Sequence, residues 1–174
     1  MSFTMSQALL PALTIGLEAL SKVLDKGAAF AAARKFDPAL LLGMRLAPDM
    51  FALTRQVQVA TDLAKNGAAR LAGVEPPRFE DNETTIDQLK DRIARAVTFI
   101  KSVDTKKIDA SADRELTFPL GPVNKGQMVG ADYLTHFVLA NFYFHCTAAY
   151  AILRHAGVEI GKRDFLGQIP MKMT

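Results

Sequence analysis

LPALTIGLEALSKVL, residues 10–24, carries leucines at positions 10, 13, 17, 20 and 24. These alternating steps of three and four residues place the leucines on one face of an α-helix. Ser6 is expected to cap the start of this helix, and Gly27 to interrupt it. Residues 28–36 could then add a short helix before the Asp37-Pro38 break. The stretch predicts a helix that buries one apolar stripe.

A second helix is expected to start at Pro48-Asp49, because proline suits the first turn and an acid complements the helix dipole there. Its apolar face consists of Met50, Leu53, Val57, Ala60 and Ala64. Asn66-Gly67 resembles a stop signal, although Ala68–Leu71 could extend the helix. The proline-containing segment from Gly73 to Glu83 is then expected to form a loop.

A third helix is expected to open at Thr85, because Gln88 completes the spacing of a capping box. Its apolar stripe is made of Ile86, Leu89, Ile93, Val97 and Ile100, and the pattern fades near Val103. A fourth helix should run from about Asp132 to His155 and end at Gly157. Four long helices with apolar stripes predict an all-α fold, a four-helix bundle.

Between the third and fourth helices the sequence is less regular. Residues 104–114 are a polar linker, and 116–118 and 127–129 could pair as a short β-hairpin about the turn Pro119–Pro122. The tail 158–174 is expected to pack as coil. With 174 residues and no break in composition, the chain is expected to be a single domain, 1–174.

Composition excludes several classes of protein. The chain is 49% apolar with a net charge of +3, which excludes a disordered or highly charged tail protein. One cysteine excludes a disulfide framework and any cysteine-rich zinc or iron–sulfur site, and three histidines leave little material for a His-based metal site. The 21 basic residues are scattered and nearly balanced by 18 acidic ones, so we expect no nucleic-acid partner.

The segment Tyr133–Leu153 has no Lys, Arg, Asp or Glu and is long enough to span a bilayer. It nevertheless contains His136, Asn141 and His145, which are costly in hydrocarbon unless a partner satisfies them. We therefore interpret it as the central helix of a soluble bundle and expect no membrane partner. The N-terminus lacks the features of a signal peptide, and the lone thiol of Cys146 agrees with a cytoplasmic location.

Aromatic residues point in several directions around the fourth helix, including Phe137, Phe142, Tyr143 and Phe144. A helix that is apolar all round must be covered on more than one side. The bundle covers one side, and the hairpin, the tail or a second subunit must cover the rest. This pattern favours a homodimer. Cys146 is interpreted as a small buried hydrophobe.

Three polar residues are the candidates for a functional site. Asn141 and His145 are four residues apart and share a face of the fourth helix, and Gln56 lies on the inward side of the second helix. His136 lies about 180° from His145 around the helix, and His155 stands at its end. Gln58 is expected to face water. Gln56, Asn141 and His145 could form a structural polar network that fixes helix register, or a site inside the bundle.

Several motifs resemble those of a known bacterial family. They are Arg45-Leu-Ala-Pro-Asp-Met50, Ala72-Gly-Val-Glu-Pro-Pro77, Asn141-Phe-Tyr-Phe-His145, Tyr150-Ala-Ile-Leu-Arg-His155 and Gly161-Lys-Arg-Asp-Phe-Leu166. Together they resemble a family within the DinB-like (YfiT-like) metalloenzyme superfamily, over nearly the whole chain. The resemblance implies a four-helix bundle.

The resemblance also implies a metal site made of three histidines, one from the second helix and a His-x-x-x-His pair from the last. Some members transfer low-molecular-weight thiols or act as thiol-dependent isomerases with a divalent metal. Carried over to this sequence, the three positions are Gln56, Asn141 and His145. Two amides and one imidazole would hold zinc or nickel poorly unless a further ligand such as Asp49 joined them.

Two functional hypotheses follow. The first is a ligand-binding or non-catalytic bundle whose metal site is degenerate, with Gln56, Asn141 and His145 lining the pocket. The alternative is a metal-dependent enzyme of the DinB-like thiol-transferase type, in which His145 is the catalytic base or the one strong ligand of a zinc or nickel ion. Whether the protein binds metal would separate the two.

Overall fold

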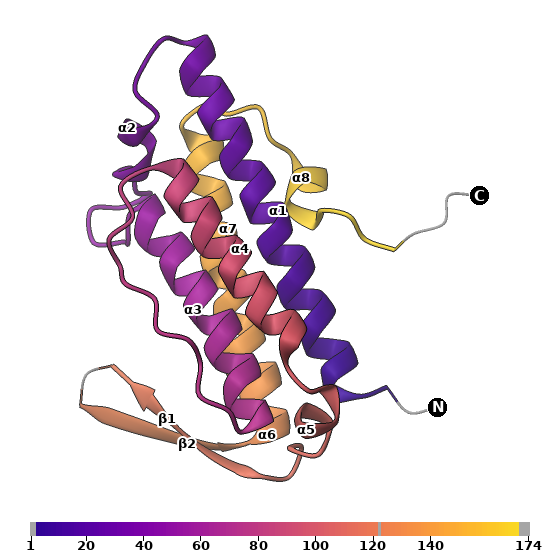
Figure 1. The fold of residues 1–174 in the computed structure, drawn as a ribbon. Coiled ribbons are helices and arrows are strands. Elements are labelled where there is room, and N and C mark those ends of the chain that lie inside the picture. Colours follow the sequence, from indigo (N-terminus) through magenta and orange to yellow (C-terminus); the bar gives the residue numbers. More distant parts are fainter. Residues whose placement is uncertain (1–2, 122, 171–174) are drawn as a thin grey trace.

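Four long helical segments run side by side in the computed structural model, which describes residues 3–121 and 123–170 (Figure 1). They are α1 (Met5–Ala33), α3 (Leu53–Ala72), α4 (Ile86–Ser102) and the joined segment η1 (Tyr133–Leu139) and α7 (Ala140–His155). Helix α1 packs on α4 and α7, and α3 packs on the same two helices. The predicted four-helix bundle is thus confirmed.

Short elements lie between the long helices and after the last one. They are α2 (Ala39–Leu42), α5 (Thr105–Asp109), β1 (Glu115–Leu120), β2 (Asn124–Val129), α6 (Gly130–Asp132) and α8 (Lys162–Leu166). Strands β1 and β2 form the antiparallel hairpin expected between the third and fourth long helices, at the end of the bundle near α5 (Figure 1). Pro119 and Leu120 belong to β1 rather than to the turn, and Pro122 lies outside the described residues.

Helix α1 is continuous where the sequence predicted an interruption. Gly27 lies inside this helix. A side chain at this position would come within 3.2 Å of Leu153 on α7, so glycine here lets the two helices approach. The expected short helix over 28–36 is instead the last part of α1 and the turn after it. The prediction of a break at Gly27 was therefore wrong.

The N-cap of α1 is Thr4 rather than Ser6. The Thr4 hydroxyl accepts a hydrogen bond from the Gln7 backbone N–H, and the Gln7 side chain accepts one from the Thr4 N–H. Ser6 instead donates from its N–H and its hydroxyl to the carboxylate of Asp109 on α5. Ser6 thus ties α5 to the first turn of α1.

Helix α3 begins at Leu53, five residues later than predicted. The Leu53 N–H donates to the Met44 carbonyl over 2.9 Å, so the chain between them forms a loop and Asp49 is exposed outside the helix. The helix also runs past Asn66-Gly67 to Ala72 and ends at Gly73, whose φ of 68° is left-handed. A side chain at Gly67 would lie 2.6 Å from Cγ1 of Val138, so this glycine permits close helix packing rather than a stop.

The fourth long helix begins near the predicted position but is not regular. A π-helical segment, η1, lies between α6 and α7. Its Tyr133 and Phe137 stack on each other, and both pack against the tilted ring of Phe118 in the hairpin, with ring centroids 4.5 to 5.4 Å apart. Arg70 of α3 donates to the Tyr133 hydroxyl over 2.9 Å. The hairpin thus covers one end of this apolar helix.

The tail was expected to pack as coil, but it contains a short helix. Helix α8 packs on α1, where Asp164 pairs with Lys26 at 2.6 Å, and its Phe165 meets the Tyr150 ring of α7 edge-on. Gly161, just before α8, donates its N–H to the Asp164 carboxylate, which stabilises the first turn. Residues 171–174 lie outside the described part of the chain.

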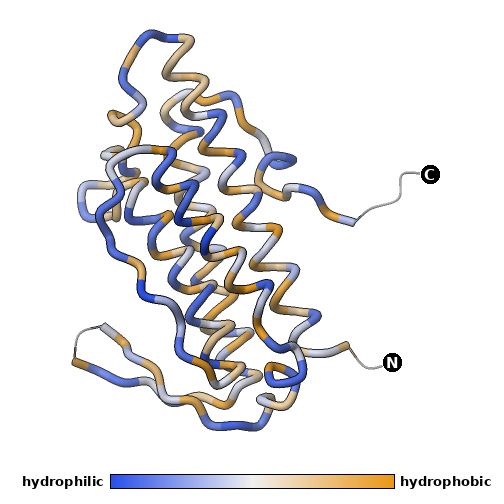
Figure 2. The backbone as a smooth tube through the Cα atoms, viewed as in Figure 1, coloured by the Kyte–Doolittle hydropathy of each residue, from blue (hydrophilic) through white to orange (hydrophobic). Residues whose placement is uncertain are grey.

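Apolar residues recur along the bundle helices and alternate with hydrophilic ones (Figure 2). Among the described residues one helix, α1, is long and apolar enough to cross a bilayer by length and composition. Here α1 is a bundle helix whose leucine stripe is buried, and the core helix of a soluble protein commonly passes the same test. The segment Tyr133–Leu153, singled out from the sequence, does not meet it.

Candidate functional site

Gln56 of α3 and His145 of α7 meet between the two helices. The imidazole Nδ1 lies 2.7 Å from the Gln56 side-chain oxygen Oε1. Gln56 is 1% exposed and His145 is 9% exposed, so the contact is buried. The inward placement of Gln56 follows from the stripe of α3, because residue 56 lies beside Leu53 and Ala60 on the helix surface.

A second hydrogen bond fixes the orientation of the amide. Gln56 Nε2 donates to the backbone carbonyl of Phe51 over 3.1 Å, which leaves Oε1 facing the imidazole ring. An amide oxygen only accepts hydrogen bonds, so the Nδ1 atom of neutral His145 carries the proton. The lone pair of the neutral ring is consequently on Nε2. Gln56 therefore sets the tautomer of His145.

His145 Nε2 is accessible to solvent. Every buried side-chain nitrogen or oxygen in the described part of the chain has a hydrogen-bond partner. No described residue forms a hydrogen bond with Nε2, so this atom is not buried. Burial of the ring, together with the positive charge of Arg55, lowers the pKa of His145 below its usual value. The ring is thus neutral at pH 7 and presents an unprotonated nitrogen at the surface.

Aromatic rings flank the imidazole on two sides. Phe51 stacks on it with the ring planes 21° apart, and Phe144 meets it edge-on with centroids 5.1 Å apart. Both phenylalanines are more than half exposed, at 51% and 58%. The Arg55 guanidinium lies over the Phe51 ring, 5.9 Å from its centroid. The accessible nitrogen therefore lies on an apolar surface next to one cation.

Asn141 does not join this pair. Its side-chain Nδ2 donates to the Phe137 backbone carbonyl over 2.6 Å, and the Ala140 N–H is directed to the same oxygen. Phe137 lies in η1, where hydrogen bonding changes from the π to the α pattern, and Asn141 satisfies a carbonyl at that transition. His136 is exposed and lies near Asp132, away from His145 as its helical position indicated.

The arrangement does not fit a zinc or nickel ion. Ligands about 2.0 to 2.2 Å from a tetrahedral metal lie roughly 3.3 Å apart, whereas Nδ1 and Oε1 are 2.7 Å apart and share a proton. Asn141 faces its own helix, and Asp49 lies in the loop before α3. Within residues 3–121 and 123–170, no three His, Cys, Asp or Glu side chains gather where they could hold a metal.

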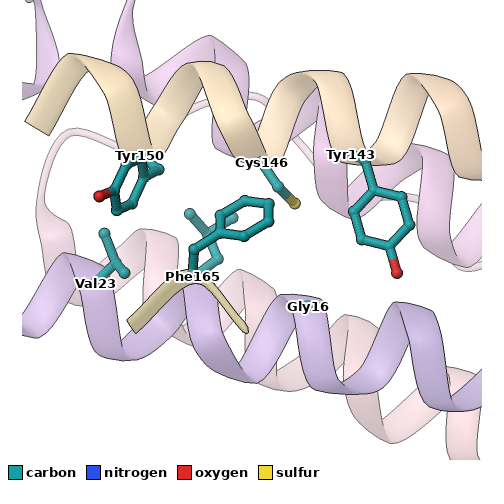
Figure 3. A pocket seen from close by; sticks show the side chains of 7 residues that line it. Gly16, Val23, Tyr143, Cys146, Tyr150 and Phe165 are labelled. Atoms are coloured by element: carbon teal, nitrogen blue, oxygen red, sulfur yellow. The ribbon is translucent and has the colours of Figure 1, made fainter. Parts of the chain in front are cut away.

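Cys146, next to His145, faces a different part of the molecule. It lines a narrow cavity between α1, α7 and α8 with Gly16, Val23, Tyr143, Tyr150 and Phe165 (Figure 3). The cavity volume is about 20 Å³, close to what one water molecule requires. Burial raises the pKa of the Cys146 thiol far above its usual value. The thiol is therefore protonated, as buried structural cysteines are.

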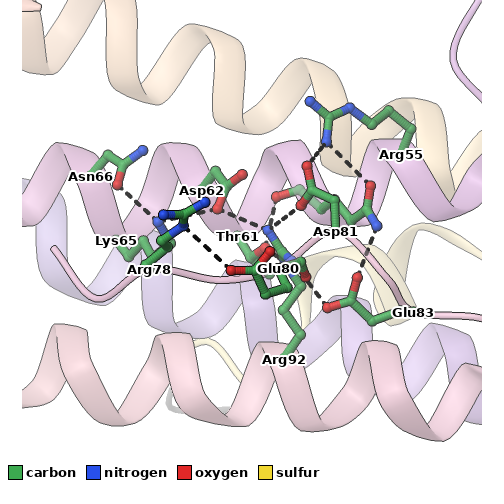
Figure 4. Close-up of polar contacts among 11 residues, drawn as sticks. Arg55, Thr61, Asp62, Lys65, Asn66, Arg78, Glu80, Asp81, Glu83 and Arg92 are labelled. Atoms are coloured by element: carbon green, nitrogen blue, oxygen red, sulfur yellow. Dashed lines mark hydrogen bonds and ion pairs between the residues drawn. The ribbon is translucent and has the colours of Figure 1, made fainter.

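A buried ionic cluster, which the sequence analysis above did not predict, lies between α3, α4 and the segment 73–85 (Figure 4). Arg92 stands at the centre of this cluster and is 0% exposed. Its guanidinium donates to the Thr61 hydroxyl, to the Glu80 carbonyl and to the carboxylates of Asp62 and Glu83, and it pairs with Asp81 at 3.0 Å. This cluster holds the long segment 73–85 against the bundle.

Gln58 belongs to the same cluster, so the prediction that it faces water was wrong. It is 4% exposed and donates to the Glu83 carboxylate over 2.8 Å. The segment 73–85 covers the side of α3 that would otherwise be solvated. The acidic residues at 80, 81 and 83 were the available signal, because several acids in one loop require basic or amide partners when the loop packs.

Replacing Gln56 by glutamate should raise the pKa of His145, the opposite of what burial and Arg55 do in the native chain. A carboxylate at the position of Oε1 would accept the Nδ1 proton and stabilise the charged ring. We expect His145 to titrate above its usual range in Gln56→Glu and below it in the native protein. An NMR titration of the imidazole resonances measures both, and an unchanged pKa would contradict the contact.

Comparisons with known proteins agree with this fold. Residues 5–166 match the family model DUF1993, described as a domain of unknown function. The chain is also similar to the crystal structure of a DinB family member protein from Shewanella denitrificans. The two are 37% identical, with a TM-score of 0.88, over 97% of this chain and 95% of the other. A comparison with curated proteins found no match.

Proposed function

We propose that this chain, which belongs to the DUF1993 family of DinB-like proteins, binds a small molecule at His145 without a metal. The observation that carries this proposal is the bond from Gln56 Nε2 to the Phe51 carbonyl. It directs the amide oxygen to Nδ1 and leaves Nε2 as an outward-facing acceptor. Gln56 is the positioning residue, and His145 is the residue that meets the ligand.

The surroundings of His145 indicate the chemistry of that ligand. The neutral Nε2 would accept a hydrogen bond from an O–H or N–H group. Phe51 and Phe144 would cover the apolar part of the molecule, since exposed aromatic side chains provide contact area with few rotamers to restrict. Arg55 lies beside Phe51 and would favour a negative charge nearby. Asn141 lies one turn from His145 and borders this surface.

Metal content tests this proposal against the metal-dependent enzyme of the DinB-like thiol-transferase type. Protein purified without a His tag and incubated with zinc or nickel should retain far less than one equivalent after dialysis, measured by elemental analysis. One equivalent that disappears in His145→Ala would overturn the proposal in favour of the enzyme.

A second variant makes the metal experiment decisive. Gln56→His together with Asn141→His would place three imidazoles at the positions that the resemblance assigns to ligands. Histidines four residues apart on one helix face can bind one zinc ion, and an imidazole on the neighbouring helix can complete the set. We expect this double variant to retain zinc where the native chain does not, which verifies that the assay detects such a site.

We further propose that the protein forms a homodimer through the uncovered face of α7. The hairpin covers η1, and α8 covers Tyr150, but Tyr143 and Phe144 remain 41% and 58% exposed. Contiguous exposed aromatic residues are typical of interaction surfaces. Light scattering should give twice the chain mass, and Phe144→Asp should shift it to the monomer mass. A native chain that is monomeric at every concentration would overturn this part.

A further inference from the structure

A groove between the end of α1 and the chain after α7 shares no residue with the His145 site. It lies where α1 and α7 both end, at the top of the bundle in Figure 1. Lys26, Phe30 and Arg34 of the α1 side and Gly157, Val158 and Glu159 of the chain after α7 line it. Its volume of about 450 Å³ is within the usual range for small-molecule sites.

Opposite charges face this groove without pairing with each other. Among the described residues, neither Arg34 nor Glu159 forms an ion pair within 4.0 Å, although both line the same space. The Arg34 guanidinium lies on the Phe30 ring, 5.1 Å from its centroid. Lys26, the other cation, is held at 2.6 Å by Asp164 of α8. One guanidinium and one carboxylate are therefore available to a ligand.

The backbone that carries Glu159 is held in place on both sides. The Val158 N–H donates to the Leu153 carbonyl, and its own carbonyl accepts from the Ile160 N–H over 2.9 Å and from Arg154 over 3.3 Å. These bonds form a tight turn centred on Glu159. A binding group on a rigid turn loses less conformational entropy when a ligand arrives.

Gly157 lines the groove beside the Phe30 ring. Its φ of 97° is one that side-chain-bearing residues rarely adopt, and a side chain there would lie 3.4 Å from Cζ of Phe30. The Phe30 ring also packs edge-on against Phe36, with centroids 5.8 Å apart. Phe30 is thus held between Phe36 and the Arg34 guanidinium.

The helix ends add to the charge separation. The last carbonyls of α7 carry partial negative charge, which favours a cation near Glu159. Arg34, which forms no ion pair within 4.0 Å among the described residues, favours an anion on the α1 side. From this arrangement we propose that the groove binds a small zwitterion, an amino acid whose carboxylate meets Arg34 and whose ammonium meets Glu159. The hydrocarbon between the two charges lies on Phe30.

The experiment titrates the full chain with glycine, β-alanine, 4-aminobutyrate and 6-aminohexanoate, which differ in the separation of the two charges. Butyrate and butylamine, each with a single charge, are the controls. Amide NMR shifts of Phe30 and Gly157 report binding in the groove. We expect one member of the series to bind about tenfold more tightly than either control, because only a zwitterion can pair with Arg34 and Glu159 at once.

Variants distinguish a true zwitterion site from general charge attraction. Arg34→Gln and Glu159→Gln should each weaken binding of the best probe by about tenfold. Lys107→Gln and Glu115→Gln make the same charge changes on exposed residues at the other end of the bundle, and should leave binding unchanged. Butyrate binding as tightly as the zwitterions, or shifts that persist in both groove variants, would overturn the proposal. The absence of saturable shifts with all four zwitterions would do the same.

Discussion

Replacing Arg92 by methionine should lower the free energy of unfolding by about 3 to 5 kcal/mol, the usual cost of removing one partner from a buried ionic cluster. The guanidinium is fully buried and meets five groups, among them the Glu83 carboxylate, whose side chain is 4% exposed. Methionine fills most of the volume but leaves Glu83 and the Thr61 hydroxyl without this donor. Urea unfolding followed by circular dichroism measures the change.

Arg78 provides the matched control for this substitution. Its side chain is 89% exposed and pairs with Glu80 at 3.4 Å in solvent. Arg78→Met should therefore change stability by less than about 0.5 kcal/mol. Equal effects of the two substitutions would show that the cluster does not hold the segment 73–85 in place.

The effect of Arg92→Met should also depend on pH. Burial raises the pKa of the Glu83 carboxyl, but the hydrogen bonds from Gln58 and Arg92 outweigh burial and hold that pKa below its usual value. A lowered carboxyl pKa contributes stability above the unfolded-state value, about 4.3. That contribution is lost as the pH falls through the folded-state pKa. The difference in free energy of unfolding between the native protein and Arg92→Met should accordingly narrow below about pH 4.3.

Replacing Gly130 by alanine should destabilise the protein by at least about 3 kcal/mol, the upper range for overpacking. A side chain at Gly130 would lie 1.9 Å from the backbone oxygen of Ser111, a residue that is itself 0% exposed. The Gly130 N–H and the Ala131 N–H also bond to the carbonyls of Arg114 and Ala112. Relief of the clash would therefore break the contacts that attach the hairpin to the bundle.

Gly43 is the control for the alanine substitution. Its φ is −83°, and no heavy atom lies within 4 Å of where its side chain would be. Gly43→Ala should leave stability unchanged or raise it by up to about 1 kcal/mol, because alanine restricts the unfolded chain. Thermal unfolding of the two variants side by side compares them. Similar melting temperatures would contradict the close approach at Gly130.

The helical stripes could be predicted because they depend only on spacing along the chain. Leu13, Leu17, Leu20 and Leu24 are all buried, as are Ile86, Leu89, Ile93 and Ile100. Helix ends were harder to place, because a cap depends on neighbours. Gly27 and Gly67 carry the sequence signal of a stop, yet each lies inside a helix where another helix packs closely.

The candidate site was predictable to the same extent. The contact between Gln56 and His145 follows from two inward-facing polar residues on adjacent helices, since buried polar groups find partners. The orientation of Asn141 could not be predicted, because its side chain bonds to a carbonyl of the π-helical segment η1. The burial of Gln58 could not be predicted either, because it depends on where the long segment 73–85 lies.

The four helices, the hairpin and the family resemblance could all be predicted from residue type and local spacing, without knowledge of the packing. The same is true of the single histidine at the positions where that resemblance implies three. Which nitrogen of His145 faces outward depends on the packed helices, because the Phe51 carbonyl orients Gln56 and Gln56 orients the ring. Hydrogen bonds between distant residues form only after the helices pack, and the chemistry available at His145 follows from them.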